Sequence, residues 1–267
     1  MTTAIAGSGV GALLRSWRSR RRVSQLELAS RADSSARHIS FIETGRSRPS
    51  QEMVLRLADH LDIPVRERNA LLVAAGYAPH YPESSLDDPS LSGLREGLER
   101  LLTAYEPYPA LVMNARYEVV AANAGTAMLL AGLPEHLTRA PVNAMRVTMH
   151  PEGIARRILN YRQWREHLLE QMERQLALLR SEPLRVLYEE VSAYPLPAER
   201  DQLATPEEVH APFALPMVIE HEGRALSFIS TVTTFNTPMD VTVSELAVET
   251  FLPADSETAR FLHQTWP

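Results

Sequence analysis

Apolar residues in the first eighty positions recur at helical spacing, in short stretches separated by polar residues. Val10, Leu13, Leu14 and Trp17, for example, fall on one face of a helix. Residues that commonly open a helix precede each later stretch. They are Ser24 with Glu27, Ser34 or Ser35, Pro49 with Ser50, and Pro64. The pattern therefore predicts five short helices between residues 10 and 77.

The pattern changes after this region. Residues 79–90 contain three prolines and no apolar period, which predicts a linker or a strap that joins two domains. We accordingly divide the chain into a first domain over 1–80, a linker over 81–92 and a second domain over 93–267.

The second domain combines helical and strand patterns. A helix through Leu94 and Leu98 is followed by two short strands over 110–113 and 117–121. A long amphipathic helix then begins near Ile154 and Ile158 and continues to residue 179. The end of the chain predicts an antiparallel meander with strands over 215–221, 225–235 and 241–252, the last with a bulge near Ser244. The predicted fold is therefore an all-α domain followed by an α+β domain with an antiparallel sheet.

The residue types that are missing exclude several chemistries. The chain has 267 residues and no Cys, and all of its 27 basic residues are Arg. Without Cys there is no disulfide, iron–sulfur cluster or thiolate zinc site. Without Lys there is no Walker-type phosphate loop and no Schiff base. No stretch has the roughly 20 apolar residues of a membrane span, so we expect a cytoplasmic protein without a membrane partner.

Charge is divided unevenly along the chain. Residues 1–82 hold 12 Arg and 7 acidic residues, a net charge of +5, whereas the remainder holds 15 Arg and 26 acidic residues, a net charge of −11. Phosphate contacts are therefore expected in the first domain, because the acidic remainder would be repelled by nucleic acid.

The stretch from residue 24 to residue 50 has the parts of a bihelical DNA reader: a capped helix, a tight turn and a second helix. In the second helix Ile39 and Ile42 are three apart and should be buried, which leaves Ala36, Arg37, Ser40 and Phe41 facing outward. Arg37 could pair with a guanine there. Gln25 at the start of the first helix is expected to hold a DNA phosphate, and Arg46, Ser47 and Arg48 are expected to grip the DNA backbone. His38 is ambiguous. The candidate DNA-contacting residues are Gln25, Ser35, Ala36, Arg37, His38, Ser40, Phe41, Arg46, Ser47 and Arg48. The sequence thus predicts binding to double-stranded DNA.

The first domain resembles the XRE, or Cro/repressor, family of helix-turn-helix regulators. The matching segments are Leu14-Arg15-x-x-Arg18, Ser24-Gln25-x-x-Leu28-Ala29, Ile39-Ser40-x-x-Glu43-x-Gly45-Arg46 and Pro49-Ser50. The resemblance implies a lambda-repressor-like domain of five helices and a largely buried ion pair between Arg18 and Glu43. Asp33 replaces the Gly often found in the turn, which Asp tolerates if its φ is positive.

A longer stretch of the chain, from Arg37 through Pro79, looks like the MmyB-like regulators. Asn114-Ala115-Arg116-Tyr117, Ala122-Asn123 and the ending through Pro253-Ala254-Asp255 also fit that family, although its Trp-Ala-x-His-Asp-Val segment is missing here. The resemblance implies a PAS-like domain with a non-covalent, fatty-acid-like effector and no other cofactor. The candidate ligand-binding residues are Met113, Asn143, Arg146, Trp164, Leu168, Phe228 and Ile229.

The expected protein is a homodimeric transcription regulator controlled by a small apolar ligand. An alternative is that its second domain serves only for dimerisation or for docking a partner protein. The nine His residues show no metal-ligand spacing. No nucleophile and base are found together, so no catalytic residue is assigned and an enzyme is not expected.

Overall fold

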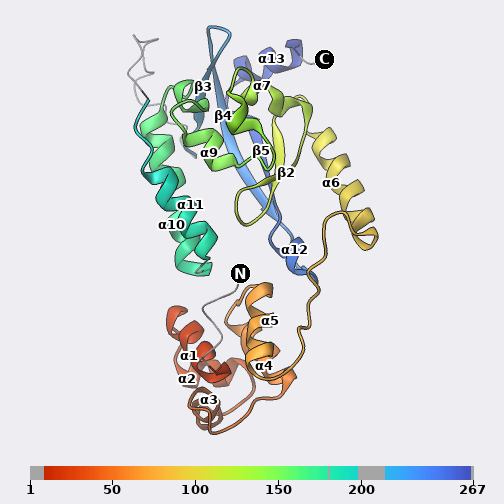
Figure 1. The fold of residues 1–267 in the computed structure, drawn as a ribbon, viewed down its shortest axis with the longest axis vertical. Coiled ribbons are helices and arrows are strands. Elements are labelled where there is room, and N and C mark those ends of the chain that lie inside the picture. Colours follow the sequence, from red (N-terminus) through yellow and green to blue (C-terminus); the bar gives the residue numbers. More distant parts are fainter. Residues whose placement is uncertain (1–8, 180, 198–213, 266–267) are drawn as a thin grey trace. The chain divides into compact units, whose positions relative to one another are not determined.

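The computed structural model describes residues 9–179, 181–197 and 214–265 (Figure 1). Contacts within the chain divide it into two compact units. Unit 1 comprises residues 1–85 together with 236–244, and unit 2 comprises residues 86–235 and 245–267. A short segment from late in the sequence therefore belongs to the N-terminal unit.

Unit 1 contains the five short helices that the sequence predicts, around one apolar core. Their bounds are α1 (Val10–Arg20), α2 (Gln25–Arg31), α3 (Ala36–Glu43), α4 (Gln51–His60) and α5 (Val65–Ala74). Leu14, Leu28, Ile39, Leu57 and Leu71 from the five helices are each 1% exposed and share one cluster. The apolar side chains of this core are closely packed, so the five helices are held in fixed positions against one another.

The serines that the sequence predicts at the N-termini of the helices are found there as helix caps. Ser24 and Ser50 accept hydrogen bonds from the backbone N–H groups of Glu27 and Met53, and Ser35, not Ser34, caps α3 through the N–H of His38. The turn between α2 and α3 places Asp33 at φ 48°, as the comparison with Gly implied.

Two further segments complete unit 1 beside its five helices. Residues 79–85, which we call the strap, follow α5, and residues 236–244, which we call the β4–β5 loop, contain the single turn α12 (Val241–Ser244). The backbone N–H of Val241 donates to the carbonyl of Pro82 at 2.8 Å, which joins the loop to the strap.

Unit 2 is built on one antiparallel sheet of five strands in the order β2-β1-β5-β4-β3. The strands are β1 (Ala110–Met113), β2 (Val119–Ala122), β3 (Met217–His221), β4 (Arg224–Thr234) and β5 (Ala247–Pro253). The pairings Leu111↔Glu249 and Val232↔Glu249 place β5 at the centre. The antiparallel sheet that the apolar alternation predicts is thus confirmed.

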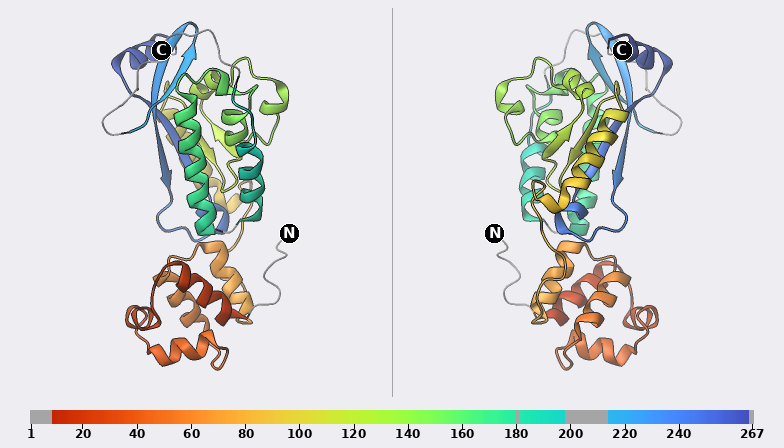
Figure 2. Two further views of the ribbon diagram at one scale, coloured as in Figure 1. Left: turned by 90° about the vertical axis from the view of Figure 1, so that its left-hand side faces the viewer. Right: turned by 90° about the vertical axis from the view of Figure 1, so that its right-hand side faces the viewer.

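Helices cover both faces of this sheet (Figure 2). On the outer face α6 (Ser92–Ala104) packs against Ala110 and Val112, and on the inner face α10 (Tyr161–Leu179) and α11 (Glu182–Ser192) pack in a larger cluster with Leu111 and Met113. All four residues of β1 are therefore buried. The remaining helices are α7 (Ala127–Leu130), α8 (Glu135–Thr138), α9 (Ala144–Met149) and α13 (Ser256–Thr265), with short 3-10 turns at Pro89–Leu91, Ala124–Thr126 and Ile154–Arg156.

Two predicted elements are wrong. The long helix does not include Ile154 and Ile158: both are buried, but α10 begins only at Tyr161 and Ile158 instead forms a bridge with β3. The last strand does not begin at Val241, because Asp240 caps the helical turn α12 and the strand starts at Ala247. In both cases residues predicted to be buried, such as Ile158 and Val241, are buried, but the backbone at these positions has a different secondary structure from the one predicted.

Candidate DNA-reading surface and ligand-binding unit

Helix α3 is held in place by a buried ion pair beneath it. Arg18 donates from Nε and Nη2 to the two carboxylate oxygens of Glu43, at 2.6 Å and 2.9 Å, as the family resemblance implied. The Arg18 and Glu43 side chains are only 14% and 3% exposed. Burial by itself would raise the pKa of Glu43, but hydrogen bonds from Arg18 and Gln25 outweigh it and hold the pKa below its usual value. The carboxylate is therefore charged and ties α1 to the last turn of α3.

Gln25 supports this arrangement from α2. Its Nε2 donates to Glu43 Oε2 at 2.8 Å, so at least one donor of the side-chain amide is directed into the domain. The sequence placed this amide against a DNA phosphate, and the structure gives it a scaffolding contact. Its contact with phosphate stays a prediction.

The outward side of α3 carries two guanidinium groups around one aromatic ring. Arg37 lies 5.2 Å from the centre of the Phe41 ring and Arg46 lies 5.9 Å from it. Arg37 and Arg46 are exposed, while Ile39 and Ile42 on the opposite side are 1% exposed. Stacking on Phe41 limits where both cations can move, which is what a side chain that reads one base edge requires.

The other candidates on α3 and at its N-cap differ in exposure and in the contacts that they make. Ala36 is half-buried and packs against the core of unit 1, so it does not face outward as expected. His38 is half-buried and its Nδ1 lies 3.3 Å from the hydroxyl of Ser34. Ser40 is half-buried, and Ser35 uses its hydroxyl as the helix cap. Arg37, Phe41 and Arg46 are therefore the best-presented group.

The arginines beyond α3 differ from one another. Arg46 and Ser47 follow Gly45, which has φ 74°, and their backbone N–H groups both donate to the carbonyl of Phe41. Arg48 instead donates to the carbonyl of Ala75 at 3.0 Å and stacks on Tyr77 at 5.2 Å. The contact of all three with the DNA backbone stays a prediction, and Arg48 in addition ties the end of α5 to the rest of unit 1.

Four of the residues predicted to bind ligand lie together in unit 2. Met113, Trp164, Leu168 and Phe228 belong to the cluster on the inner face of the sheet and are between 0% and 6% exposed. Ile229 pairs with Leu252 in the register of β4 and β5, so it lies on the opposite face of the sheet from Phe228.

The two polar candidates for the ligand head group already have partners. The side chain of Asn143 caps α9 by accepting from the N–H groups of Met145 and Arg146. The Arg146 guanidinium donates to both carboxylate oxygens of Glu190 at 2.7 Å. The Arg146 side chain is 44% exposed, and the pair lowers the pKa of Glu190. A ligand carboxylate at Arg146 would therefore compete with Glu190.

Sequence reasoning missed an acid on the inner face of the central strand. Glu249 shares that face with Ala247 and Phe251, and it accepts a hydrogen bond from the Ser230 hydroxyl at 2.6 Å. Burial of its carboxyl group raises the pKa, even though the residue as a whole is half-buried. Glu249 interrupts the otherwise apolar inner-face positions of this strand, a signal that could have identified it.

A histidine and acid cluster was also missed. One ligand atom from each of His136, His150 and Glu152 lies within 4.8 Å of the others, although His136 is distant in sequence. The backbone N–H of Glu152 donates to His150 Nδ1 at 3.1 Å. Because Nδ1 accepts this hydrogen bond, the proton of the neutral His150 ring is on Nε2.

Among the described residues, no helix is both long and apolar enough to cross a bilayer.

Comparisons with known proteins agree with this organisation. The family model described as the MmyB-like transcription regulator ligand binding domain matches residues 94–264, and a helix-turn-helix domain model matches residues 10–71. No curated protein matched the chain.

Two solved structures are similar over part or most of the chain. The clp gene regulator ClgR from Corynebacterium glutamicum is 28% identical over 37% of this chain and 90% of its own, with a TM-score of 0.22. An RNA-binding light-oxygen-voltage receptor is 12% identical over 98% of this chain and 64% of its own, with a TM-score of 0.26. Both TM-scores are too low to support an argument about function. The two family models together cover both units, and on that basis the chain is a DNA-binding transcription regulator that belongs to the family with an MmyB-like ligand-binding domain.

Proposed function

We propose that this regulator reads its DNA site mainly through Arg37, with Phe41 and Arg46 as its immediate neighbours. The observation that carries this proposal is the pair of exposed cations, Arg37 on α3 and Arg46 just after it, that flank the half-buried Phe41 ring, while the other side of the helix is buried. A guanidinium in the major groove pairs with the O6 and N7 atoms of guanine, and a good pair of this kind discriminates by about 1–3 kcal/mol.

The test compares specific with non-specific binding. A preferred duplex is first selected from a random pool with the full-length protein, and binding to it and to an unrelated duplex is then measured at one salt concentration. Arg37→Ala should weaken binding to the selected duplex by about 5- to 150-fold and to the unrelated duplex much less. Arg174→Ala is a matched control, because it removes the same charge from the exposed surface of α10. Equal losses on both duplexes would contradict base reading by Arg37.

We further propose that the protein binds DNA as a homodimer. Two copies of α3 would enter successive major grooves about 34–36 Å apart, and the preferred site would be roughly palindromic. Sedimentation of the complex with the selected duplex should show two chains per site. One chain bound to a site without two-fold symmetry would overturn the dimer.

For unit 2 we propose a small, largely apolar ligand, with a fatty acid as the first candidate. Six Met residues lie in the cluster on the inner face, and Met adapts to irregular ligands. Met113, Trp164, Leu168 and Phe228 are in contact with this core, so a ligand among them has to separate side chains that now pack together.

The ligand is tested with probes that share one apolar tail. A lipid extract of the purified protein is analysed by mass spectrometry, and thermal shifts are then measured with dodecanoate and with dodecanol. If Arg146 binds the head group, dodecanoate gives the larger shift and Arg146→Gln removes the difference, while Arg174→Gln retains it. No shift with either probe and no co-purified lipid would overturn the proposed ligand.

A further inference from the structure

The β4–β5 loop joins two strands of unit 2, yet its contacts place it in unit 1. The chain therefore passes between the two units at residues 85–86, 235–236 and 244–245. Only the first of these passages is a simple connection between domains. The other two belong to one hairpin, whose strands lie in the sheet and whose tip is held elsewhere.

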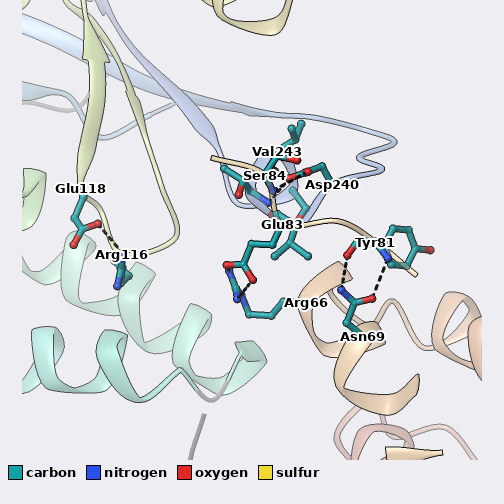
Figure 3. A network of polar contacts seen from close by, with 12 residues as sticks. Arg66, Asn69, Tyr81, Glu83, Ser84, Arg116, Glu118, Asp240 and Val243 are labelled. Carbon is teal, nitrogen blue, oxygen red and sulfur yellow. Dashed lines mark hydrogen bonds and ion pairs between the residues drawn. The ribbon is translucent and has the colours of Figure 1, made fainter. Parts of the chain in front are cut away.

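Asp240 makes the contacts that hold this tip (Figure 3). One carboxylate oxygen accepts from the backbone N–H of Ser84 in the strap at 3.1 Å, and the other accepts from the N–H of Thr242 at 2.7 Å. Asp240 thus caps α12 and binds the strap at the same time. Asp240 is 7% exposed and the adjacent Val241 is 1% exposed, so these two residues are buried, whereas Met239 beside them is exposed.

The strap is in turn fixed to helix α5. Asn69 accepts from the backbone N–H groups of His80 and Tyr81 at 3.0 Å and 3.1 Å, and it donates to the carbonyl of Tyr81 at 2.7 Å. Arg66 forms two hydrogen bonds with the carboxylate of Glu83, at 2.7 Å and 3.0 Å (Figure 3). A continuous set of polar contacts therefore runs from α5 through the strap to Asp240.

The other end of the hairpin is a stiff ribbon in the sheet. β4 and β5 pair over seven positions, from Phe228 with Pro253 to Thr234 with Ala247. Side-chain hydrogen bonds also join the two strands on both faces, Ser230 to Glu249 and Thr231 to Thr250, each at 2.6 Å. A displacement of the inner face at these strands would be transmitted along the ribbon, because the paired strands move together.

We propose that Asp240 is a positioning residue through which ligand binding in unit 2 and DNA binding in unit 1 influence each other. The inference rests on the proposed function, in which a ligand in unit 2 controls DNA binding. With Asp240 docked, a change in the β4–β5 ribbon reaches the strap and α5. Without the Asp240 carboxylate the loop loses its hydrogen bond to Ser84 and its cap at Thr242 and keeps the backbone hydrogen bond from Val241 to Pro82, so most of the influence is lost. Coupling between two sites is reciprocal, so DNA must affect the ribbon as the ribbon affects DNA binding.

This reciprocity allows a test without knowing the ligand. Hydrogen exchange of the full-length protein is measured with and without the duplex selected for Arg37, in wild type, Asp240→Ala and the conservative variant Asp240→Asn. Asp255→Ala is the matched control, because Asp255 also caps a helix through one backbone N–H, that of Thr258 at 2.7 Å. DNA affinity is measured in parallel for every variant.

In wild type and Asp255→Ala, DNA should slow exchange in the ribbon, over residues 228–234 and 247–253. In Asp240→Ala that slowing should disappear, while DNA affinity stays within about twofold. Exchange at the N–H groups of Ser84 and Thr242 should rise about tenfold or more, since hydrogen bonds to a charged acceptor are lost. Asp240→Asn, which keeps the size of the side chain, should lie between the two.

Slowing that persists in Asp240→Ala, or that is missing in wild type although DNA binds, would overturn the role of Asp240. A protein that binds no duplex with preference would instead refute the proposed function. The two failures are therefore distinguishable. If Asp240→Ala does not fold, the ribbon in Asp240→Asn must still lose part of its response to DNA.

Discussion

Each unit of this regulator contains a glutamate whose carboxyl group is enclosed by protein, and the two are in opposite electrostatic situations. Glu43 in unit 1 accepts hydrogen bonds from Arg18 and Gln25, and its pKa is lowered. Glu249 in unit 2 accepts one hydrogen bond from Ser230, and its pKa is raised. The same side chain is thus stabilised in its charged form in one unit and in its neutral form in the other.

The difference between the pKa values of Glu43 and Glu249 reflects the different cores of the two units. In unit 1 the charge is paired and locks α3, whose outward side carries Arg37, so the polar core serves a rigid reading surface. In unit 2 no cation is among the groups that shift the pKa of Glu249, and the carboxyl group has a hydroxyl as its partner. An enclosed acid of this kind is costly to ionise, so unit 2 is less stable than its apolar core alone would make it.

The largest expected effect comes from breaking the ion pair of unit 1. Glu43→Gln leaves the buried Arg18 guanidinium without its counter-charge and should destabilise unit 1 by about 3–5 kcal/mol. Stability is measured by denaturant unfolding, and hydrogen exchange at amides of α1 and α3 is used to monitor unit 1. The double variant Arg18→Met, Glu43→Leu is the control, and it should lose less than the single variant because no charge is left unpaired. An unchanged unfolding midpoint for Glu43→Gln would mean that α3 is held by its apolar contacts alone.

The second effect is the pH dependence of that loss. The pKa of Glu43 is lower in the folded than in the unfolded protein, so its contribution is present above the unfolded pKa of about 4.3 and is lost as pH falls through the folded pKa. The stability difference between wild type and Glu43→Gln should therefore shrink between neutral pH and the acid side of that window. A difference independent of pH would show that the variant acts through packing.

The interior of unit 1 was largely predictable from sequence, for a physical reason. Its helices are local, each start is marked by a capping side chain such as Ser24 or Ser50, and the apolar spacing leaves few ways to pack five short helices. The Arg18–Glu43 pair followed from the resemblance to a family. The outward direction of Ala36 and the contact of Arg48 with Ala75 were harder to predict, because both depend on which neighbouring element covers the residue.

Unit 2 and the β4–β5 loop were less predictable. Val241 and Val243 alternate as in a strand, but Asp240 accepts from the N–H of Thr242 and turns the chain into a helical turn. The backbone N–H of Val241 donates to the carbonyl of Pro82, more than 150 positions earlier, and no local pattern specifies such a contact. Ile229 was assigned to the same site as Phe228, although neighbouring residues of a strand face opposite sides.

The third effect has the opposite sign and belongs to unit 2. The pKa of Glu249 is higher in the folded than in the unfolded protein, so ionising it costs stability once pH rises through the folded pKa. Glu249→Gln removes this titration, so its stability relative to wild type should increase as pH rises above the unfolded pKa of about 4.3, with no gain below it. Unfolding is followed at amides of β1 and β5. A relative stability that instead falls as pH rises would mean that Glu249 has a cationic partner and resembles Glu43 after all.

The smallest effect separates the hydroxyl from the acid. Ser230→Ala removes the donor to Glu249 and should cost about 0.5–1 kcal/mol, because the carboxyl group loses a hydrogen bond. Thr231→Val is the control on the other face of the same strand, where the partner of Thr231 is the hydroxyl of Thr250. In a double-mutant cycle with Glu249→Gln, the effect of Ser230→Ala should become smaller, since an amide oxygen is a weaker acceptor than a carboxylate. If the two changes are instead additive, the hydrogen bond does not support the charge, and the contrast between Glu43 and Glu249 comes from burial and the missing cation alone.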